Sequence, residues 1–135
     1  MGESIPDQII CPSLEEMKRQ ALQGVKDGRR VILLLEGSTD ESTGESWCSD
    51  CRAAEPIIEE CLSKASPQVM MLFAEIGQKE DFNADNVFVK DPLIHLGKIP
   101  TMIKMALQTQ ELKEDSRLVE KQCCDVGQVS IFLQA

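Results

Sequence analysis

A block of five aliphatic residues, Val31 to Leu35, constrains the fold of this chain more than any other segment. The block is far too short for a membrane span, which needs about 20 apolar residues. It is also too uniform for a strand with one solvated face, because successive side chains of a strand point to opposite sides of the sheet. The sequence therefore predicts a central strand at Val31–Leu35 that is covered on both faces.

The rest of the chain alternates between helix and strand patterns. Helices are predicted from the Ser13 N-cap to Gly24 or Gly28, over Cys48–Ala65 with Pro56 inside it, and from Asp125 onward. Strands are predicted at Gln8–Cys11, Val69–Ile76, Thr101–Leu107 and Arg117–Glu120. Loops are predicted at Gly37–Ser46 and Gln78–Asp91, with a short helix at Asp91–Leu93 that Gly97 closes. This order predicts an α/β fold, a central mixed β-sheet flanked by helices on both faces.

Length and charge restrict the class of protein. The 135 residues suit a single domain spanning 1–135, which needs no metal or disulfide to hold its core. With 14 basic and 23 acidic residues, the net charge of −9 argues against nucleic acid and anionic membranes as partners. The N-terminus lacks the basic and apolar regions of a signal peptide. We therefore expect a cytoplasmic, monomeric protein.

Two of the six cysteines, Cys48 and Cys51, form a Cys-x-x-Cys pair between the central strand and the next helix. In a reducing compartment, closely spaced cysteines are more often redox catalysts or metal ligands than structural disulfides. Cys48 falls at the predicted helix N-terminus, where free N–H groups and the helix dipole favour the thiolate. The spacing predicts that Cys48 attacks a disulfide and that Cys51 resolves the mixed disulfide.

A zinc site is the alternative interpretation of this pair. Zinc takes four ligands in structural sites, and the pair supplies only two. The other candidates lack the spacing of a second zinc knuckle: Cys11, Cys61, His95, Cys123 and Cys124. We therefore predict no metal site. Cys11, Cys61 and His95 are expected to pack in the core, and the adjacent Cys123 and Cys124 to serve as cap and core positions or as an extra redox site.

Two prolines add to the pattern around the pair. Pro56 lies five residues beyond Cys51, and Ile99-Pro100-Thr101 precedes a late predicted strand. Together with Trp47, which directly precedes Cys48, these features resemble the thioredoxin superfamily. Residues within Gly37–Pro56 are similar to a cytosolic thioredoxin-related branch of this superfamily, and the similarity runs from about Gln8 to Leu133.

The resemblance implies a thioredoxin fold in which Pro100 is cis and faces the dithiol. It also implies roles for the residues around the pair. Cys48 would be the nucleophile, Cys51 the resolving thiol, and the substrate contacts would come from Trp47, Ser49, Ile99 and Pro100. No cofactor would be bound, and electrons would come from NADPH through thioredoxin reductase.

Two departures from the thioredoxin pattern concern the chemistry of the pair. Ser49 stands where the family usually has proline, which leaves the turn less rigid. No acid lies inside Val31–Leu35, where thioredoxins place a buried proton acceptor, so Asp50, Glu36 and water are the candidates. Asp50 either complements the helix dipole or transfers a proton and tunes the thiols.

The expected function is that of a cytosolic thiol–disulfide oxidoreductase that reduces small or selected protein disulfides through Cys48 and Cys51. The alternative is a redox-sensitive protein-binding module with little turnover. The segment Glu36–Ser46 is longer than the usual link from strand to tryptophan and carries four acids. We expect it either to limit access of bulky or acidic protein substrates or to be a tolerated surface insertion.

Overall fold

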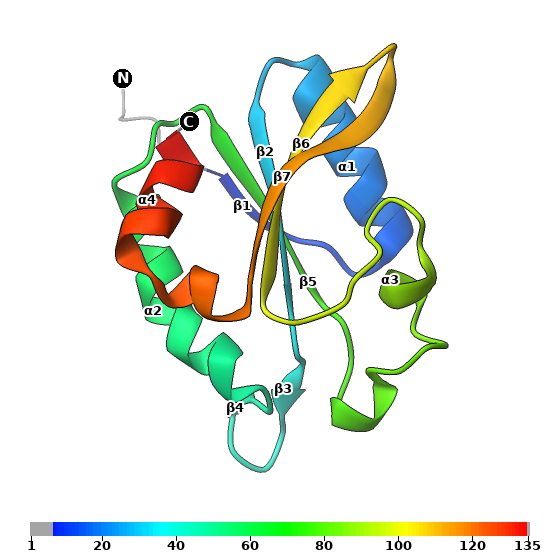
Figure 1. The fold of residues 1–135 in the computed structure, drawn as a ribbon, viewed down its shortest axis with the longest axis vertical. Helices are drawn as coiled ribbons and strands as arrows, with labels where there is room; N and C mark the ends of the chain where they lie inside the picture. Colours follow the sequence, from blue (N-terminus) through cyan, green and yellow to red (C-terminus); the bar gives the residue numbers. More distant parts are fainter. Residues whose placement is uncertain (1–6, 135) are drawn as a thin grey trace.

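The computed structural model describes residues 7–134 as a five-stranded β-sheet with helices on both sides (Figure 1). The strands, in order across the sheet, are β1 (Asp7–Ile10), β5 (Val69–Glu75), β2 (Arg30–Glu36), β6 (Thr101–Gln108) and β7 (Glu111–Val119). The helices are α1 (Leu14–Lys26), α2 (Ser49–Ser63), α3 (Val87–Lys90) and α4 (Val126–Gln134), with 3-10 turns at Lys79–Asp81 and Glu120–Cys124. Within this described part, no helix is long and apolar enough to cross a bilayer.

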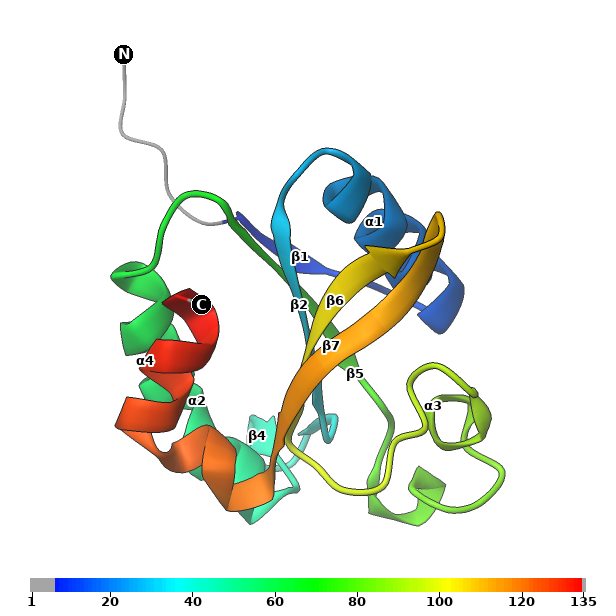
Figure 2. The same cartoon turned by 45° about the horizontal axis from the view of Figure 1, so that its top comes forward.

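The sheet is mixed, as predicted. β1 and β2 each run parallel to β5, whereas β6 pairs antiparallel with both β2 and β7. Figures 1 and 2 show α1 and α3 on one face of the sheet and α2 and α4 on the other. The predicted α/β architecture with helices on both faces is therefore confirmed.

β2 lies at the centre of the sheet because both of its faces are apolar. Leu33 and Leu35 pack into the core on the α1 side, and Ile32 and Leu34 pack into the core on the α2 side. Each of these four side chains is at least nine-tenths buried. Glu36 follows Leu34 in the same alternating series, so its carboxyl group falls on the α2 side of the sheet.

The predicted caps of the first and last helices are present. Ser13 Oγ accepts a hydrogen bond from the backbone N–H of Glu16 at 3.1 Å and so begins α1. Gly28, with a φ of +80°, follows the end of that helix. Asp125 Oδ1 accepts from the N–H of Gln128 at 3.1 Å at the start of α4. In each case a side-chain oxygen satisfies an N–H group that has no partner inside the helix.

The helix predicted at Asp91–Leu93 is wrong. Asp91 directly follows α3, which begins earlier, after Asn86. The Asp91 carboxylate accepts from the N–H groups of Leu93 at 3.0 Å and Ile94 at 2.9 Å, and so holds a turn. The Asp-Pro pair therefore ends a helix, because the carboxylate that could cap a new helix closes this turn instead.

Two other segments are more regular than predicted. The strand predicted at Arg117–Glu120 is the far end of β7, which starts at Glu111 and pairs with β6 along its length. The Gly37–Ser46 segment contains a small antiparallel ribbon, β3 (Thr39–Asp40) and β4 (Glu45–Ser46). β7 lies at the edge of the main sheet, and β3 and β4 lie outside it. Both stretches are therefore largely polar and lack the alternation of apolar and polar residues that marks a strand in sequence.

Candidate active site

Cys48 is the N-cap residue of α2, and its sulfur accepts a hydrogen bond from the backbone N–H of Cys51 at 3.2 Å. Ser46 fixes this start of the helix beside the end of β2. Its hydroxyl donates to the carbonyl of Gly37 at 2.8 Å and accepts from the N–H of Cys48 at 3.2 Å. Both cysteines are free thiols, with 7% of Cys48 and 1% of Cys51 exposed. Cys48 is therefore the sulfur that solvent and substrate reach first.

The Ile99–Pro100 segment lies against the pair. Its peptide bond is cis. The carbonyl oxygen of Ile99 lies 3.9 Å from Cys48 Sγ, and the carbonyl of Pro100 accepts a hydrogen bond from the N–H of Glu120 at 2.7 Å. Because the Pro100 carbonyl is tied to the end of β7, the Ile99 carbonyl is held facing Cys48 Sγ. An extended chain bound at this position would meet a backbone acceptor directly beside the Cys48 sulfur.

Trp47 is half-buried and is held by its ring nitrogen. Nε1 donates to the carbonyl of Gly77 at 2.8 Å. A Cβ at Gly37 would lie 2.7 Å from the indole ring, so the ring packs directly on the backbone of a residue that has no side chain. The indole is thus fixed between the ends of β2 and β5, next to Cys48.

Cys51 holds its proton more tightly than an ordinary cysteine. Burial raises the pKa of Cys51 above its ordinary value, and the adjacent Cys48 sulfur and the charge of Glu36 raise it further. A hydrogen bond from the backbone N–H of Gly37 opposes this rise by favouring the thiolate. Cys51 therefore keeps its proton until another group accepts it.

Thioredoxins place a buried proton acceptor inside the strand that corresponds to Val31–Leu35, where this chain has no acid. Glu36 directly follows that stretch, and it is buried. Only 6% of the residue is exposed, and among residues 7–134 nothing hydrogen-bonds its buried Oε2. Burial, followed by the negative charges of Glu55, Glu75 and Glu59, raises the pKa of Glu36 from 4.5 to about 7. The prediction that Glu36 begins the polar link between the central strand and Trp47 is wrong, because the residue is the last one of β2.

The other proposed proton carrier, Asp50, lies half-buried in the first turn of α2. Its backbone carbonyl lies 3.7 Å from Cys124 Sγ, which brings a third sulfur next to the pair. Burial, with the charges of Asp50 and Cys48, raises the pKa of Cys124. Burial also raises the pKa of Cys123 to about 12, so that thiol stays protonated in the core.

The remaining candidate residues, Cys11, Cys61 and His95, differ in burial. Cys11 and Cys61 are buried in the core, as expected. His95 is exposed on a loop with a φ of 43°, so the expectation that it packs in the core is wrong. Within residues 7–134, no group of three or more histidine, cysteine, aspartate or glutamate side chains is placed to hold a metal ion.

A shallow cleft of about 440 Å³ opens over the dithiol. Trp47, Cys48, Ser49, Asp50 and Ile99 line one part of it, and the rest is formed by Lys79, Phe82, Gly97, Lys98 and Glu120. Ser49 is exposed at this surface. The β3–β4 segment, which was expected to restrict this site, contributes none of these described residues. Thr39, Gly44 and Glu45 from it line a different cavity, on the α2 side of the sheet.

The fold matches that of solved thioredoxins. The thioredoxin of Trichomonas vaginalis has a TM-score of 0.57 over 97% of this chain and 96% of its own, at 14% identity. Thioredoxin O2 of Arabidopsis thaliana in the oxidized state has a TM-score of 0.54 over 84% of this chain and 82% of its own, at 18% identity. A thioredoxin fold with a Cys-x-x-Cys pair at the start of α2 defines a thioredoxin-like protein of the thiol–disulfide oxidoreductase type.

Sequence comparison narrows this class. The profile described as "Thioredoxin domain-containing protein 17-like, thioredoxin domain" matches residues 11–135, and the chain belongs to this family. Thioredoxin domain-containing protein 17 of Homo sapiens is 26% identical over 127 residues, which cover 93% of this chain and 94% of that protein. The Mus musculus protein of the same name is 28% identical over 106 residues, covering 78% and 79%. Thioredoxin-like protein Clot of Arabidopsis thaliana is 29% identical over 96 residues, covering 69% and 72%.

Proposed function

We propose that this protein is a cytosolic disulfide reductase that acts on small disulfides and on selected protein disulfides. The observation that carries the proposal is the position of Cys48. Its sulfur caps α2, lies 3.9 Å from the Ile99 carbonyl and borders an open cleft. A sulfur at a helix N-terminus beside a backbone acceptor is suited to attack a disulfide held in an extended chain.

In the first step, the Cys48 thiolate attacks one sulfur of the substrate disulfide. The substrate S–S bond breaks, a new S–S bond joins Cys48 to the substrate, and the other substrate sulfur leaves as a thiolate that takes up a proton. Trp47, Ser49, Ile99 and Pro100 hold the substrate segment at the sulfur. The shallow cleft favours small disulfides and exposed protein disulfides over buried ones.

In the second step, Cys51 releases the substrate. Cys51 gives up its proton, its thiolate attacks Cys48 Sγ, and the mixed disulfide breaks as the Cys48–Cys51 disulfide forms. The second substrate sulfur leaves as a thiolate that takes up a proton from solvent, so the pair has donated two electrons. Glu36 accepts the Cys51 proton through an intervening water, because its pKa of about 7 suits proton transfer near neutral pH. Asp50 does not accept this proton in the proposed mechanism. It contributes a negative charge in the first turn of α2, next to the two cysteines.

No bound cofactor is needed for these two steps. The oxidised pair must then be reduced again by two electrons, and we assign that step to thioredoxin reductase, which draws the electrons from NADPH. The protein would act as a monomer in the cytoplasm, where the reducing conditions keep all six cysteines as thiols between turnovers.

The test is an assay of NADPH oxidation with thioredoxin reductase and a low-molecular-weight disulfide. Wild type should turn over many equivalents of substrate, and Cys48→Ser should show none. Glu36→Gln should slow release of the mixed disulfide by roughly 100-fold or more near pH 7, since general base catalysis typically contributes about 10²- to 10⁴-fold. Cys61→Ser is the matched control, because it removes a buried thiol outside the site. Wild-type protein that forms the mixed disulfide once without turnover would contradict the proposal and favour a redox-sensitive binding module.

A further inference from the structure

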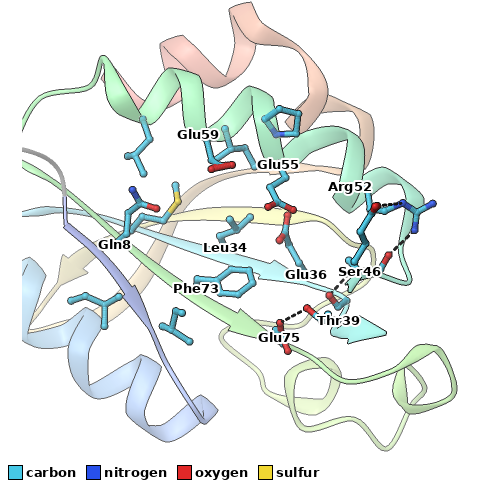
Figure 3. A pocket seen from close by; sticks show the side chains of 18 of the residues that line it. Gln8, Leu34, Glu36, Thr39, Ser46, Arg52, Glu55, Glu59, Phe73 and Glu75 are labelled. Carbon is cyan, nitrogen blue, oxygen red and sulfur yellow. Dashed lines mark hydrogen bonds and ion pairs between the residues drawn. The ribbon is translucent and has the colours of Figure 1, made fainter. Parts of the chain in front are cut away.

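A second cavity, of about 680 Å³, lies on the α2 side of the sheet, away from the cleft over the dithiol (Figure 3). It forms because α2 and α4 cover β2 and β6 but leave the β1 edge of this face open. No residue of β1 belongs to the described core on the α2 side, and Ile10 at the end of β1 is 76% exposed. Its volume lies in the range of small-molecule sites.

Five glutamates line this cavity, and four of them come from the main sheet and α2. Glu36 comes from β2, Glu75 from β5, and Glu55 and Glu59 from α2. Figure 3 shows the carboxyl groups of Glu36 and Glu55 pointing toward one another. Their mutual repulsion is one reason that the pKa of Glu36 is raised. The cavity therefore concentrates negative charge.

The basic residue that lines the cavity does not neutralise these four acids. Arg52 Nη1 donates to the carbonyl of Ser46 at 2.6 Å, and Arg52 Nε lies 3.8 Å from the carboxylate of Glu45. Arg52 and Glu45 thus balance each other at the β4 end. Glu75 accepts a hydrogen bond from Thr39 Oγ1 at 3.2 Å, a neutral donor that leaves its charge in place.

Glu36 is the observation that points to a ligand. Burying a carboxyl oxygen without a partner is costly, and here the oxygen belongs to a group nine-tenths buried that faces the cavity. A donor inside the cavity would satisfy this oxygen and relieve the repulsion among the four acids. The site is thus more complete when it is occupied by a cation.

The walls and the spacing of the acids restrict which cation fits. Within residues 7–134 no acidic cluster is placed to hold a metal ion. A ligand whose positive charges are spread along a larger molecule therefore fits the separated acids better than a single metal ion. Between the acids the wall is apolar, with Leu34, Ile58, Leu62 and Phe73. We propose that this cavity binds a small aliphatic polyamine, whose methylene chain packs on these four side chains while its ammonium groups face the acids. The site lies outside the proposed reduction mechanism except for Glu36, and its occupancy does not depend on turnover.

The test measures binding directly, by calorimetry and by shifts of backbone amide resonances, with butylamine, 1,4-diaminobutane and spermidine as probes. Affinity should rise with the number of ammonium groups, and the shifted amides should belong to β1, β5 and α2. Glu36→Gln should weaken spermidine binding by roughly tenfold, since it removes a buried charge. Glu59→Gln should weaken it by about two- to fivefold, as for an exposed pair.

Glu60→Gln is the matched control, because Glu60 is exposed on the same helix, next to Glu59, and does not line the cavity. An equal loss in Glu59→Gln and Glu60→Gln would overturn the proposal, because it would mean that spermidine only follows the net charge of −9. Absence of binding at millimolar spermidine and low salt would overturn it too. So would binding of an arginine-containing peptide without binding of spermidine. The two α2 variants keep the test decisive if Glu36→Gln fails to fold. Because binding is measured without a disulfide substrate, its failure is separate from failure of the reductase assay.

Discussion

Glu36 and Glu75 are direct neighbours in the register of β2 and β5, yet their carboxyl groups lie in opposite environments. Glu75 is exposed and accepts a hydrogen bond from Thr39 at 3.2 Å. Glu36 is 6% exposed and its Oε2 has no described partner in residues 7–134. Two acids side by side at the end of a sheet repel each other, and the buried one keeps its proton to a higher pH.

Glu36→Gln should therefore stabilise the protein above neutral pH. Unfolding returns the pKa of Glu36 from about 7 to its ordinary 4.5, so between these values only the folded state keeps the proton. The proton's contribution to stability is present below pH 4.5 and is lost as the pH rises through 7. At pH 8 the amide should raise the free energy of unfolding by about 1–3 kcal/mol, with little gain at pH 4.5. Chemical denaturation at both pH values measures this, and a gain independent of pH would contradict it. Glu60→Gln should show no such pH dependence.

Cys51→Ser should trap the mixed disulfide with substrate, whereas Cys48→Ser should form no adduct. The reason is that Cys48 lies at the cleft and Cys51 lies behind it, with a pKa raised by burial. Intact-protein mass spectrometry after incubation with a disulfide measures the adduct. An adduct on Cys48→Ser that is absent from Cys51→Ser would reverse the two roles. Cys124→Ser serves as the control for the third sulfur near the pair.

Lys79→Gln should lower kcat/KM for an anionic disulfide by about two- to threefold at low salt, because Lys79 lines the cleft over the dithiol. The effect should shrink at high salt as the charge is screened. Lys113→Gln removes an exposed charge on β7 that does not line the cleft, and Glu41→Gln changes the β3–β4 loop. Neither should alter the rate. A larger effect of Glu41→Gln would restore the loop as the element that selects substrates.

Asp91→Ala should destabilise the protein by about 2–3 kcal/mol, since it removes several hydrogen bonds from a buried carboxylate. Burial alone would raise the pKa of Asp91, but the Lys18 ammonium and the N–H groups of Ile94 and Leu93 outweigh it and lower the pKa. The stabilisation that the carboxylate supplies is therefore lost as the pH falls through its lowered pKa. Thermal unfolding of Asp91→Ala at neutral pH measures the loss. Asp85→Ala, at an exposed position of the same region, should change the melting temperature little.

The sequence predicted those parts of the fold that depend on local rules. Val31–Leu35 could be recognised as a central strand because burial on both faces requires apolar residues on both faces. Ser13 and Asp125 could be recognised as caps because a side-chain oxygen at a helix start satisfies free N–H groups. α3 was missed because its four residues are too few to show a helical period. The role of Asp91 was wrongly predicted because a carboxylate can cap a turn as well as a helix.

The dithiol and the Ile99–Pro100 segment beside it were predictable, and the acids around Glu36 were not. The spacing of Cys48 and Cys51 is visible in the sequence, but the acids around Glu36 come from two other elements, α2 and β5. Glu36 resembles any charged residue at the end of a strand until β5 and α2 are placed around it. Likewise, the β3–β4 segment follows the strand that leads to the dithiol, yet it turns toward the other cavity. Such relationships depend on tertiary contacts that no local pattern contains.

The position of the Cys48 sulfur as the N-cap of α2 couples chemistry to helix stability. The Cys51 N–H bonds to the Cys48 sulfur at 3.2 Å, and a thiolate is a stronger acceptor than a sulfur in a disulfide. Each turnover therefore weakens and then restores the cap of the helix that carries both reacting groups. The first turn of α2 should exchange its amide hydrogens faster while Cys48 is bonded to substrate, so the release step begins from a loosened helix end. In the proposed mechanism, the sulfur that attacks the substrate is thus also the atom that holds the first turn of α2 closed.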